Sequence, residues 1–595
     1  MPLRQTIAPL LVAIAFCGGI LVTPAQSAES ERPTAPYLLP NETLAYVRVA
    51  DTPELADRFK QTAIGRIFQD KQIRPLVSQL YESLVEAFRE AEQAIGLSLD
   101  QILSIPQGEL CVALVGPEEG VPAVVALLDT ADRMPFAMGL LDLIGEQMVQ
   151  NGAESSTESV KGTTLTIYDV RGDRQRQFVH FEKDETIVLS TNLDVAKQVL
   201  AAWDGGEEPM LAKNTKFTTI MRRCVGSEDE TPQITFFVDP IALAKRITRG
   251  NIAAAAGMAM LPVLGLDGIE AVGGSMTFAT EEFDDITHLH LLLDSPRSGV
   301  VEMLALDSGD TTPEPWVPAD VATYVTLNWD FSKTYSAFGT LYNSIRGEDA
   351  LARDFNQRFS DRLEIDFEED ILAALDGRVT YLAWMLRPAR MNSRANMVGV
   401  KLKDAKKFRK VFNRVLGQFE NQIKEETFAG VKYYCAAQRS EENRDRPERP
   451  LMRRPDPAFA IVGDYLLLTD STDLFKHAIS TKKDGSQALA SQLEFKLIAA
   501  KIRRQPGGEK PGLLSFTQPE EGMRLLYDLA TADTTRQRLS SGAEGNAALR
   551  SLDKALRDNP LPPFAVIAKY LAPGGRLLTN DESGFHYTSF TLRRK

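Results

Sequence analysis

Two histidines spaced two residues apart are the best-placed candidates for shared chemistry in this sequence. The stretch THLHL at 287–291 sets His288 and His290 in an alternating apolar run. Side chains two apart on a strand project from the same face, so the two imidazoles could bind one metal ion. No third ligand stands beside them, and the alternation also fits the polar outer face of a strand whose Leu289 and Leu291 point into a core. We expect this second arrangement, with a metal site at His288 and His290 as the alternative.

The short motifs of the common catalytic and nucleotide-binding sites are missing. The sequence holds no G-x-x-x-x-G-K-[ST], G-x-S-x-G, H-E-x-x-H or C-x-x-C pattern and no EF-hand loop. Its histidines are His180, His288, His290, His477 and His586. A hydrolase could still assemble Ser, Asp and His from distant positions, because a catalytic triad has no obligatory spacing. The sequence itself assigns no catalytic residue and no cofactor-binding residue.

Residues 1–27 have the layout of a secretory signal peptide. Arg4 is followed by an apolar stretch from Ile7 to Val22 and then by small residues, with cleavage expected after Ser27 or Ala28. The apolar stretch has 16 residues, whereas a membrane-spanning helix needs about 20. We therefore expect a periplasmic or secreted protein with no transmembrane span in its mature chain.

Composition limits the classes of partner. The chain of 595 residues has 44% hydrophobic and 25% charged residues, which are ordinary values for a folded protein. Its net charge is −14, whereas nucleic-acid binding needs concentrated Lys and Arg, so we expect no nucleic acid among its partners. Cys111, Cys224 and Cys435 remain after the signal peptide, and their wide spacing predicts neither a disulfide framework nor a zinc site.

The sequence of most of the mature chain repeats once. LPNETLAYVRVAD at 39–51 resembles VPADVATYVTLNW at 317–329, and further pairs follow in the same order. These pairs are 97–114 with 365–384, 124–134 with 398–408, 185–200 with 464–479, and 273–293 with 574–594. Duplication with modest insertions is the economical explanation. It predicts two tandem homologous units, residues 28–305 and 317–595, joined by the Pro-, Asp- and Thr-rich segment 306–316.

Each unit is expected to be α+β. Apolar and polar residues alternate at 44–49, as in a half-buried strand. The apolar stripe at 77–88 predicts a long amphipathic helix lying on a sheet. Two hairpin-like pairs of strands are expected on either side of a helix at 136–148, namely 109–116 with 121–128 and 163–169 with 178–191. Strands joined by hairpins predict a largely antiparallel sheet packed with amphipathic helices.

The most apolar interior run is NIAAAAGMAMLPVLGL at 251–266. It contains Pro262 and is too short to cross a membrane comfortably, so we expect a buried helix. The corresponding stretch of the second unit, NAALRSLDKALRDNPLP from Asn546, is a charged amphipathic helix. A duplicated unit would not place one copy in lipid and the other in water.

Four segments resemble a family of exported proteins. They are PNETLAYVRV at 40–49, PADVATYVTL at 318–327, DETIVLSTNLD at 184–194, and the C-terminal PPFAVIAKYLAPGGRLLTNDESGFHYTSFTLRRK. In these the chain is similar to an uncharacterised family with a duplicated domain of unknown function in planctomycete-type bacteria. The resemblance implies that the protein is exported and that it has the duplicated α+β fold described above. It supplies no catalytic residues.

The leading hypothesis for function is an exported non-catalytic protein that acts as a binding or structural module of the cell envelope. Its partner would be an envelope protein or polymer, and no cofactor is expected. One alternative is a carrier of an apolar ligand such as a lipid, suggested by the Ala- and Met-rich run at 253–261. The other is a hydrolase with dispersed catalytic residues.

Overall fold

The structure is a computed structural model of the chain. It describes residues 32–594 except 118–119, 171–175, 207–208, 226–229, 250, 357–363, 420, 438–451, 454 and 544. The predicted signal peptide therefore lies outside the described residues. Within the described part, no helix is long and apolar enough to cross a membrane.

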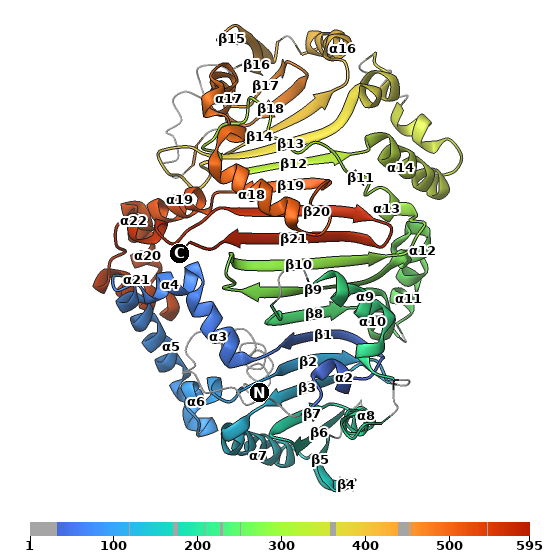
Figure 1. The fold of residues 1–595 in the computed structure, drawn as a ribbon, viewed down its shortest axis with the longest axis vertical. Coiled ribbons are helices and arrows are strands. Elements are labelled where there is room, and N and C mark those ends of the chain that lie inside the picture. Colours follow the sequence, from blue (N-terminus) through green and yellow to red (C-terminus); the bar gives the residue numbers. More distant parts are fainter. Residues whose placement is uncertain are drawn as a thin grey trace.

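A single antiparallel sheet runs the length of the molecule (Figure 1). Its strands are β1 (Thr43–Val49), β2 (Leu110–Val115), β3 (Ala123–Asp129), β4 (Glu154–Val160), β5 (Thr163–Val170), β6 (Arg176–Lys183), β7 (Thr186–Ser190), β8 (Ile234–Val238), β9 (Ile269–Phe278), β10 (Phe283–Leu293), β11 (Leu306–Asp307), β12 (Thr323–Trp329), β13 (Leu375–Met385), β14 (Arg394–Leu402), β15 (Ile423–Phe428), β16 (Val431–Ala436), β17 (Ala458–Val462), β18 (Tyr465–Thr469), β19 (Leu513–Thr517), β20 (Gly574–Asp581) and β21 (Gly584–Leu592). The predicted combination of an antiparallel sheet with helices is confirmed.

Hydrogen bonds order the strands as two series that meet in the middle. From one edge the order is β4-β5-β6-β7-β3-β2-β1-β8-β9-β10. From the other edge it is β15-β16-β17-β18-β14-β13-β12-β19-β20-β21. Strand β10 pairs with β21, and the short β11 pairs with the end of β12.

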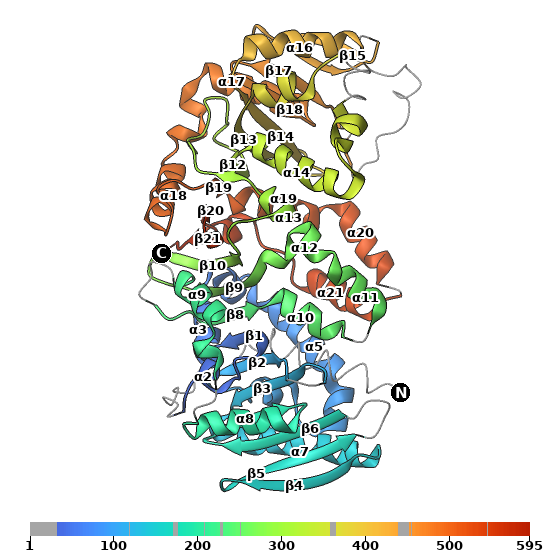
Figure 2. The ribbon, with the colours of Figure 1, turned by 90° about the vertical axis from the view of Figure 1, so that its right-hand side faces the viewer.

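Helices lie on both faces of this sheet. They are α2 (Ala35–Leu38), α3 (Thr52–Gln61), α4 (Ala63–Gln69), α5 (Arg74–Ile95), α6 (Leu99–Leu103), α7 (Met134–Gln150), α8 (Leu193–Trp203), α9 (Thr215–Arg223), α10 (Pro240–Ile247), α11 (Ile252–Ala259), α12 (Leu261–Leu264), α13 (Gly299–Glu302), α14 (Phe331–Arg346), α16 (Ala405–Gly417), α17 (Thr472–Lys483), α18 (Leu493–Arg504), α19 (Pro519–Thr531), α20 (Asp533–Gly542), α21 (Ala547–Asp558) and α22 (Ala565–Ala568). Seen edge-on, α9 and α18 lie on one side of the sheet, and α10–α13 and α19–α21 lie on the other (Figure 2).

Alternating side chains of β1 face the two sides of the sheet. Tyr46 is buried against Phe217 of α9, with the ring centroids 5.5 Å apart. Its neighbour Val47 points to the opposite side and is exposed. This alternation is the period of two that the sequence at 44–49 predicts.

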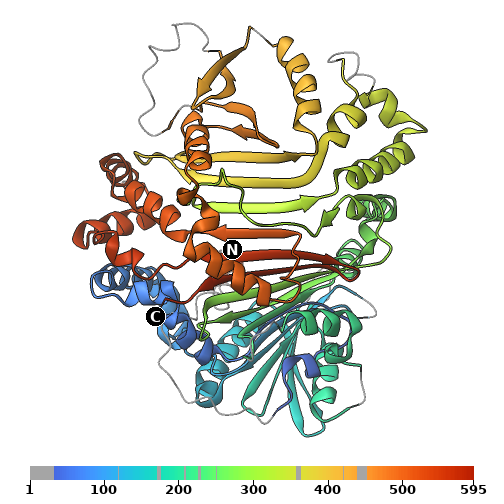
Figure 3. The same ribbon diagram turned by 45° about the horizontal axis from the view of Figure 1, so that its top comes forward.

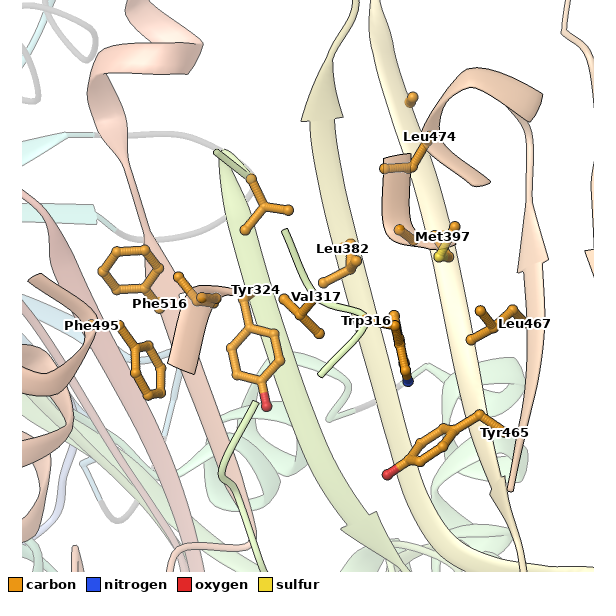
Figure 4. Close-up of a cluster of buried hydrophobic side chains, with 14 of the residues drawn as sticks. Trp316, Val317, Tyr324, Leu382, Met397, Tyr465, Leu467, Leu474, Phe495 and Phe516 are labelled. Carbon is orange, nitrogen blue, oxygen red and sulfur yellow. The ribbon is translucent and has the colours of Figure 1, made fainter. Parts of the chain in front are cut away.

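The predicted connection 306–316 ends inside a core. Trp316 and Val317 are buried between strands of the second series (Figure 4). The Trp316 ring packs edge-on against Tyr465 at 5.6 Å. On β14, a Cβ added to Gly399 would lie 2.7 Å from the Trp316 ring, so the absence of a side chain there makes room for the indole.

The long helix α5 packs differently from the sequence prediction. The apolar stripe at 77–88 is present, but the helix packs beside α21, a helix close to the other end of the chain, and Val77 of the stripe packs against Phe564 and Ile567. Both helices lie side by side at the ends of the strands (Figures 1 and 3). Gln79 reaches across the contact to Asp558, donating a hydrogen bond of 2.8 Å. An amphipathic stripe requires an apolar partner but does not specify a sheet, which is why the prediction of a helix on a sheet was wrong.

The apolar run at 251–266 also departs from prediction. It forms α11 and α12, and neither helix contains a buried residue. Ile252 is 91% exposed and Val263 is 45% exposed. The prediction of a buried helix was wrong because hydrophobicity alone does not say whether a partner covers the segment.

Candidate functional site

The β10–β21 ladder joins the two series of strands. Its register pairs Ile286 with Phe590, His288 with Thr588, and His290 with His586. At the start of β21, Gly584 has a φ of 137°, and a Cβ there would lie 1.9 Å from the carbonyl oxygen of Leu291. Glycine is therefore required for the two strands to approach at this point.

His288 and His290 lie on the buried face of the sheet, so the prediction that they lie outside was wrong. Both are at most 1% exposed, whereas Leu289 and Leu291 are half-buried on the opposite face. The sequence match makes His288 equivalent to Ser589, but His288 is buried whereas Ser589 is half-buried on the other face of its strand. A shift of one residue reverses the face of every side chain on a strand.

Three histidines gather on this face. The His586 ring lies 5.7 Å from that of His288, nearly parallel at 20°, and 5.7 Å from that of His290. His288 Nδ1 lies 3.2 Å from the hydroxyl of Thr588. Among the described residues, no three His, Cys, Asp or Glu side chains are grouped as metal ligands. Stacked imidazoles turn their faces toward each other, so we derive no metal chemistry from this cluster.

Burial keeps two of these imidazoles neutral near pH 7. For His586, burial first and then its histidine neighbours and Arg223 lower the pKa from 6.5 to about 4. For His290, burial lowers the pKa, and the Arg223 charge adds to the effect. The Nδ1 atoms of His586 and His290 have no hydrogen-bond partner among the described residues. Buried polar atoms normally have a hydrogen-bond partner. These two nitrogens are therefore candidates to form a hydrogen bond with a ligand.

Two arginines from the first half of the chain, Arg223 and Arg297, hold the turn between β20 and β21. Arg223 at the end of α9 pairs with Asp581 at 2.8 Å. Arg297 donates to Asn580 Oδ1 at 2.6 Å and lies 4.8 Å above the Phe585 ring. Asn580 in turn donates to the carbonyl of Leu306 at 2.7 Å. These contacts join parts of the chain that are far apart in sequence.

A hollow of about 1040 Å³ opens beside this turn, and we call it the junction hollow. His586 lines it and is 2% exposed. Its other walls come from the loop after β10, the β11 region, the start of α14 and the loop after α18. The charged lining residues are Arg223, Arg297, Glu302, Asp307, Asp330, Lys333, Glu509, Lys510, Asp581 and Glu582.

The residues that line the junction hollow include more carboxylates than cationic side chains. Arg223 and Arg297 are engaged by the β20–β21 turn. Within the described part of the chain, no cation pairs with Glu302, Glu509 or Glu582 at ion-pair distance, although Lys333 and Lys510 also line the hollow. A ligand that carries positive charge would complement these carboxylates.

Ser583 and His290 lie beside Asp581, which lines the junction hollow. Ser583 Oγ lies 3.4 Å from His290 Nε2 and donates to Asp581 Oδ1 at 2.6 Å. In a catalytic triad the carboxylate accepts from the histidine Nδ1–H instead. Here the carboxylate accepts from the serine, and His290 Nδ1 has no partner among the described residues. The order of contacts thus differs from a hydrolytic triad.

Reasoning from the sequence found His288 and His290 but missed the residues around them. Arg223, Asp581 and Ser583 carry no local motif, and His586 is named only as one of five histidines; the fold alone brings them together. The repeat offered one signal, because the matched segments 273–293 and 574–594 both end in the strands that meet here.

Comparison with known proteins gives one match. Residues 306–508 match the model of a family described as a protein of unknown function, DUF3352. No curated protein and no solved structure matches the chain. The matched residues run from β11 to just beyond α18 and include part of the junction hollow.

Proposed function

We propose that this protein is an exported, non-catalytic binding module of the cell envelope, and that the junction hollow holds its ligand. The ligand is polar and positively charged, such as a basic peptide segment of an envelope protein. The proposal keeps the location that the sequence of residues 1–27 predicts.

One observation carries this proposal: the junction hollow combines a nearly fully buried imidazole, whose Nδ1 has no partner among the described residues, with three carboxylates that form no ion pair with a described cation. Ligand sites are typically concave and place a few polar groups so that they fix the ligand's orientation. Neutral His586, one of the lining residues, would offer one hydrogen-bonding nitrogen. Glu302, Glu509 and Glu582 would attract the ligand's cationic groups.

The two alternative functions have less support. The Ala- and Met-rich run that suggested an apolar-ligand carrier is exposed. The serine, histidine and aspartate beside the junction hollow have contacts unlike those of a hydrolase. We therefore propose neither.

Binding of tetralysine to the mature chain, residues 28–595, tests the proposal. We expect saturable binding at one site in isothermal titration calorimetry, and none for tetraglutamate. The triple variant Glu302→Gln, Glu509→Gln, Glu582→Gln should bind tetralysine roughly tenfold more weakly, because three modest charge interactions are lost. A higher salt concentration should also weaken the binding of tetralysine to the wild type, because salt screens the charge interactions.

A matched triple variant separates the junction hollow from the overall charge of the protein. Glu82, Glu86 and Glu494 are exposed and lie outside the hollow. Changing all three to Gln alters the net charge equally and should leave tetralysine affinity within about twofold. Equal weakening by both triple variants, or no binding by the wild type, would refute the proposed site.

We also propose that residues 28–305 and 317–595 are copies of one unit joined by 306–316. The identical order of strands in the two series supports this. So do two ion pairs at positions that become equivalent when the offset of the first matched pair is extended toward the N-terminus. Arg32 pairs with Glu109 at 2.8 Å in the first unit, and Asp310 of the connecting segment pairs with Arg378 of the second unit at 3.1 Å, with the charges exchanged.

A further inference from the structure

The segment from α10 to α12 exposes an unusually apolar surface. From Ile252 to Leu266 the sequence IAAAAGMAMLPVLGL contains no charged residue. Exposed residues dominate this stretch, and Ile252, Met260 and Val263 are its large exposed hydrophobic side chains. Contiguous exposed apolar surface in a folded protein marks an interaction site.

Neighbouring elements extend this surface. Helix α12 contacts α13, where Val300 is exposed and Leu304 follows just beyond the helix. Ile247 at the end of α10 is also exposed. Figure 2 shows α10–α13 together on one side of the sheet, opposite α9 and α18. The apolar surface therefore belongs to several elements in contact and is larger than one helix.

Basic residues precede the apolar surface in the sequence. Lys245, Arg246 and Arg249 precede α11, and residues 240–266 contain no Asp or Glu. Lys245 and Arg249 are exposed. This run of basic residues, bounded by Asp239 and Asp267, contrasts with the net charge of −14 for the whole chain. These basic residues therefore favour an anionic partner at α10–α12. The negative charge of the rest of the chain disfavours such a partner elsewhere.

We propose that the surface formed by α10–α12 docks on a lipid bilayer that contains anionic headgroups. Ile252, Met260 and Val263 would enter the boundary between headgroups and acyl chains, and Lys245 would remain among the headgroups. Exposed apolar side chains next to Lys and Arg are the combination by which interfacial helices bind membranes. The segment lies on the membrane without crossing it. This inference does not depend on what the junction hollow binds.

Flotation of the mature chain with lipid vesicles tests the inference. We expect the protein to float with vesicles of phosphatidylcholine mixed with phosphatidylglycerol, and less with phosphatidylcholine alone. The double variant Ile252→Asp, Val263→Asp should lower the partition coefficient at least roughly tenfold, because both substitutions place a charge where an apolar group would enter lipid. Lys245→Glu should lower binding to the mixed vesicles by roughly fivefold or more.

Leu493→Asp provides the matched control. Leu493 is 80% exposed on α18, on the other side of the sheet, so its substitution should leave flotation unchanged. All these side chains are exposed, and circular dichroism should report an intact fold for each variant. A wild type that stays unbound, or a double variant that floats as well as the wild type, would overturn the inference. Concentration-dependent self-association abolished by the double variant would also overturn it, because the surface would then bind a second copy.

Discussion

Replacing Arg378 by Leu should lower the free energy of unfolding by about 3–5 kcal/mol. Arg378 and Glu314 are both buried, and Arg378 Nε lies 3.0 Å from Glu314 Oε1. Burial raises the pKa of Glu314, while Arg378 and a hydrogen bond from Thr380 oppose that shift. Without the guanidinium, the carboxylate stays buried without its countercharge. Urea denaturation monitored by circular dichroism measures the loss.

Two further variants show whether this loss comes from the buried charge. Arg387→Leu removes an arginine whose side chain is 55% exposed and pairs with Glu521 at 3.3 Å, and it should cost less than about 1 kcal/mol. The double variant Arg378→Leu, Glu314→Leu should recover much of the loss, because both buried charges are removed together. A loss for Arg378→Leu as small as that for Arg387→Leu would contradict this description of the core.

Acid should destabilise the protein through His586, and His586→Phe should reduce that sensitivity. The pKa of His586 falls from 6.5 to about 4 in the folded state, with burial the main cause. Between these values the unfolded chain binds a proton that the folded chain does not, so stability is lost as the pH falls. For one group this amounts to about 3 kcal/mol across that interval. The free energy of unfolding at pH 7 and near pH 4 should therefore differ less in His586→Phe than in the wild type.

Phe590→Leu serves as the control for this comparison. Phe590 is buried on the same strand and the same face but does not titrate. Its loss should lower the free energy of unfolding by a similar amount at both pH values. If His586→Phe keeps the full pH dependence of the wild type, His586 is not the group that couples acid to unfolding.

Local patterns predicted most strands of the first series. The hairpin of β2 and β3 follows from alternating or continuous apolar residues on either side of turn residues, and the helix predicted at 136–148 corresponds to α7. Strand β4 was missed because its sequence ESSTESV has no apolar alternation. As an edge strand with mostly exposed side chains, it leaves no hydrophobic signal.

Features that depend on contacts between distant residues could not be predicted. The apolar stripe of α5 predicts that one face of the helix packs against another element. Nothing in the sequence identifies α21 as the neighbouring helix. Alternation at 287–291 shows that His288 and His290 share one face of β10, but it does not say which face is more deeply buried. The junction hollow combines α9, β11, α14 and the β20–β21 turn, so no single stretch of sequence carries its pattern.

Hydrogen–deuterium exchange of the mature chain with saturating tetralysine tests the proposed binding site most directly. Slower exchange is expected in three segments that line the junction hollow, namely 302–308, 506–512 and 579–586. Exchange in α5 and in the edge strands β4 and β15, which lie outside the hollow, should stay unchanged. Protection confined to other segments, or no protection in the presence of bound tetralysine, would contradict the conclusion that the junction hollow is the binding site.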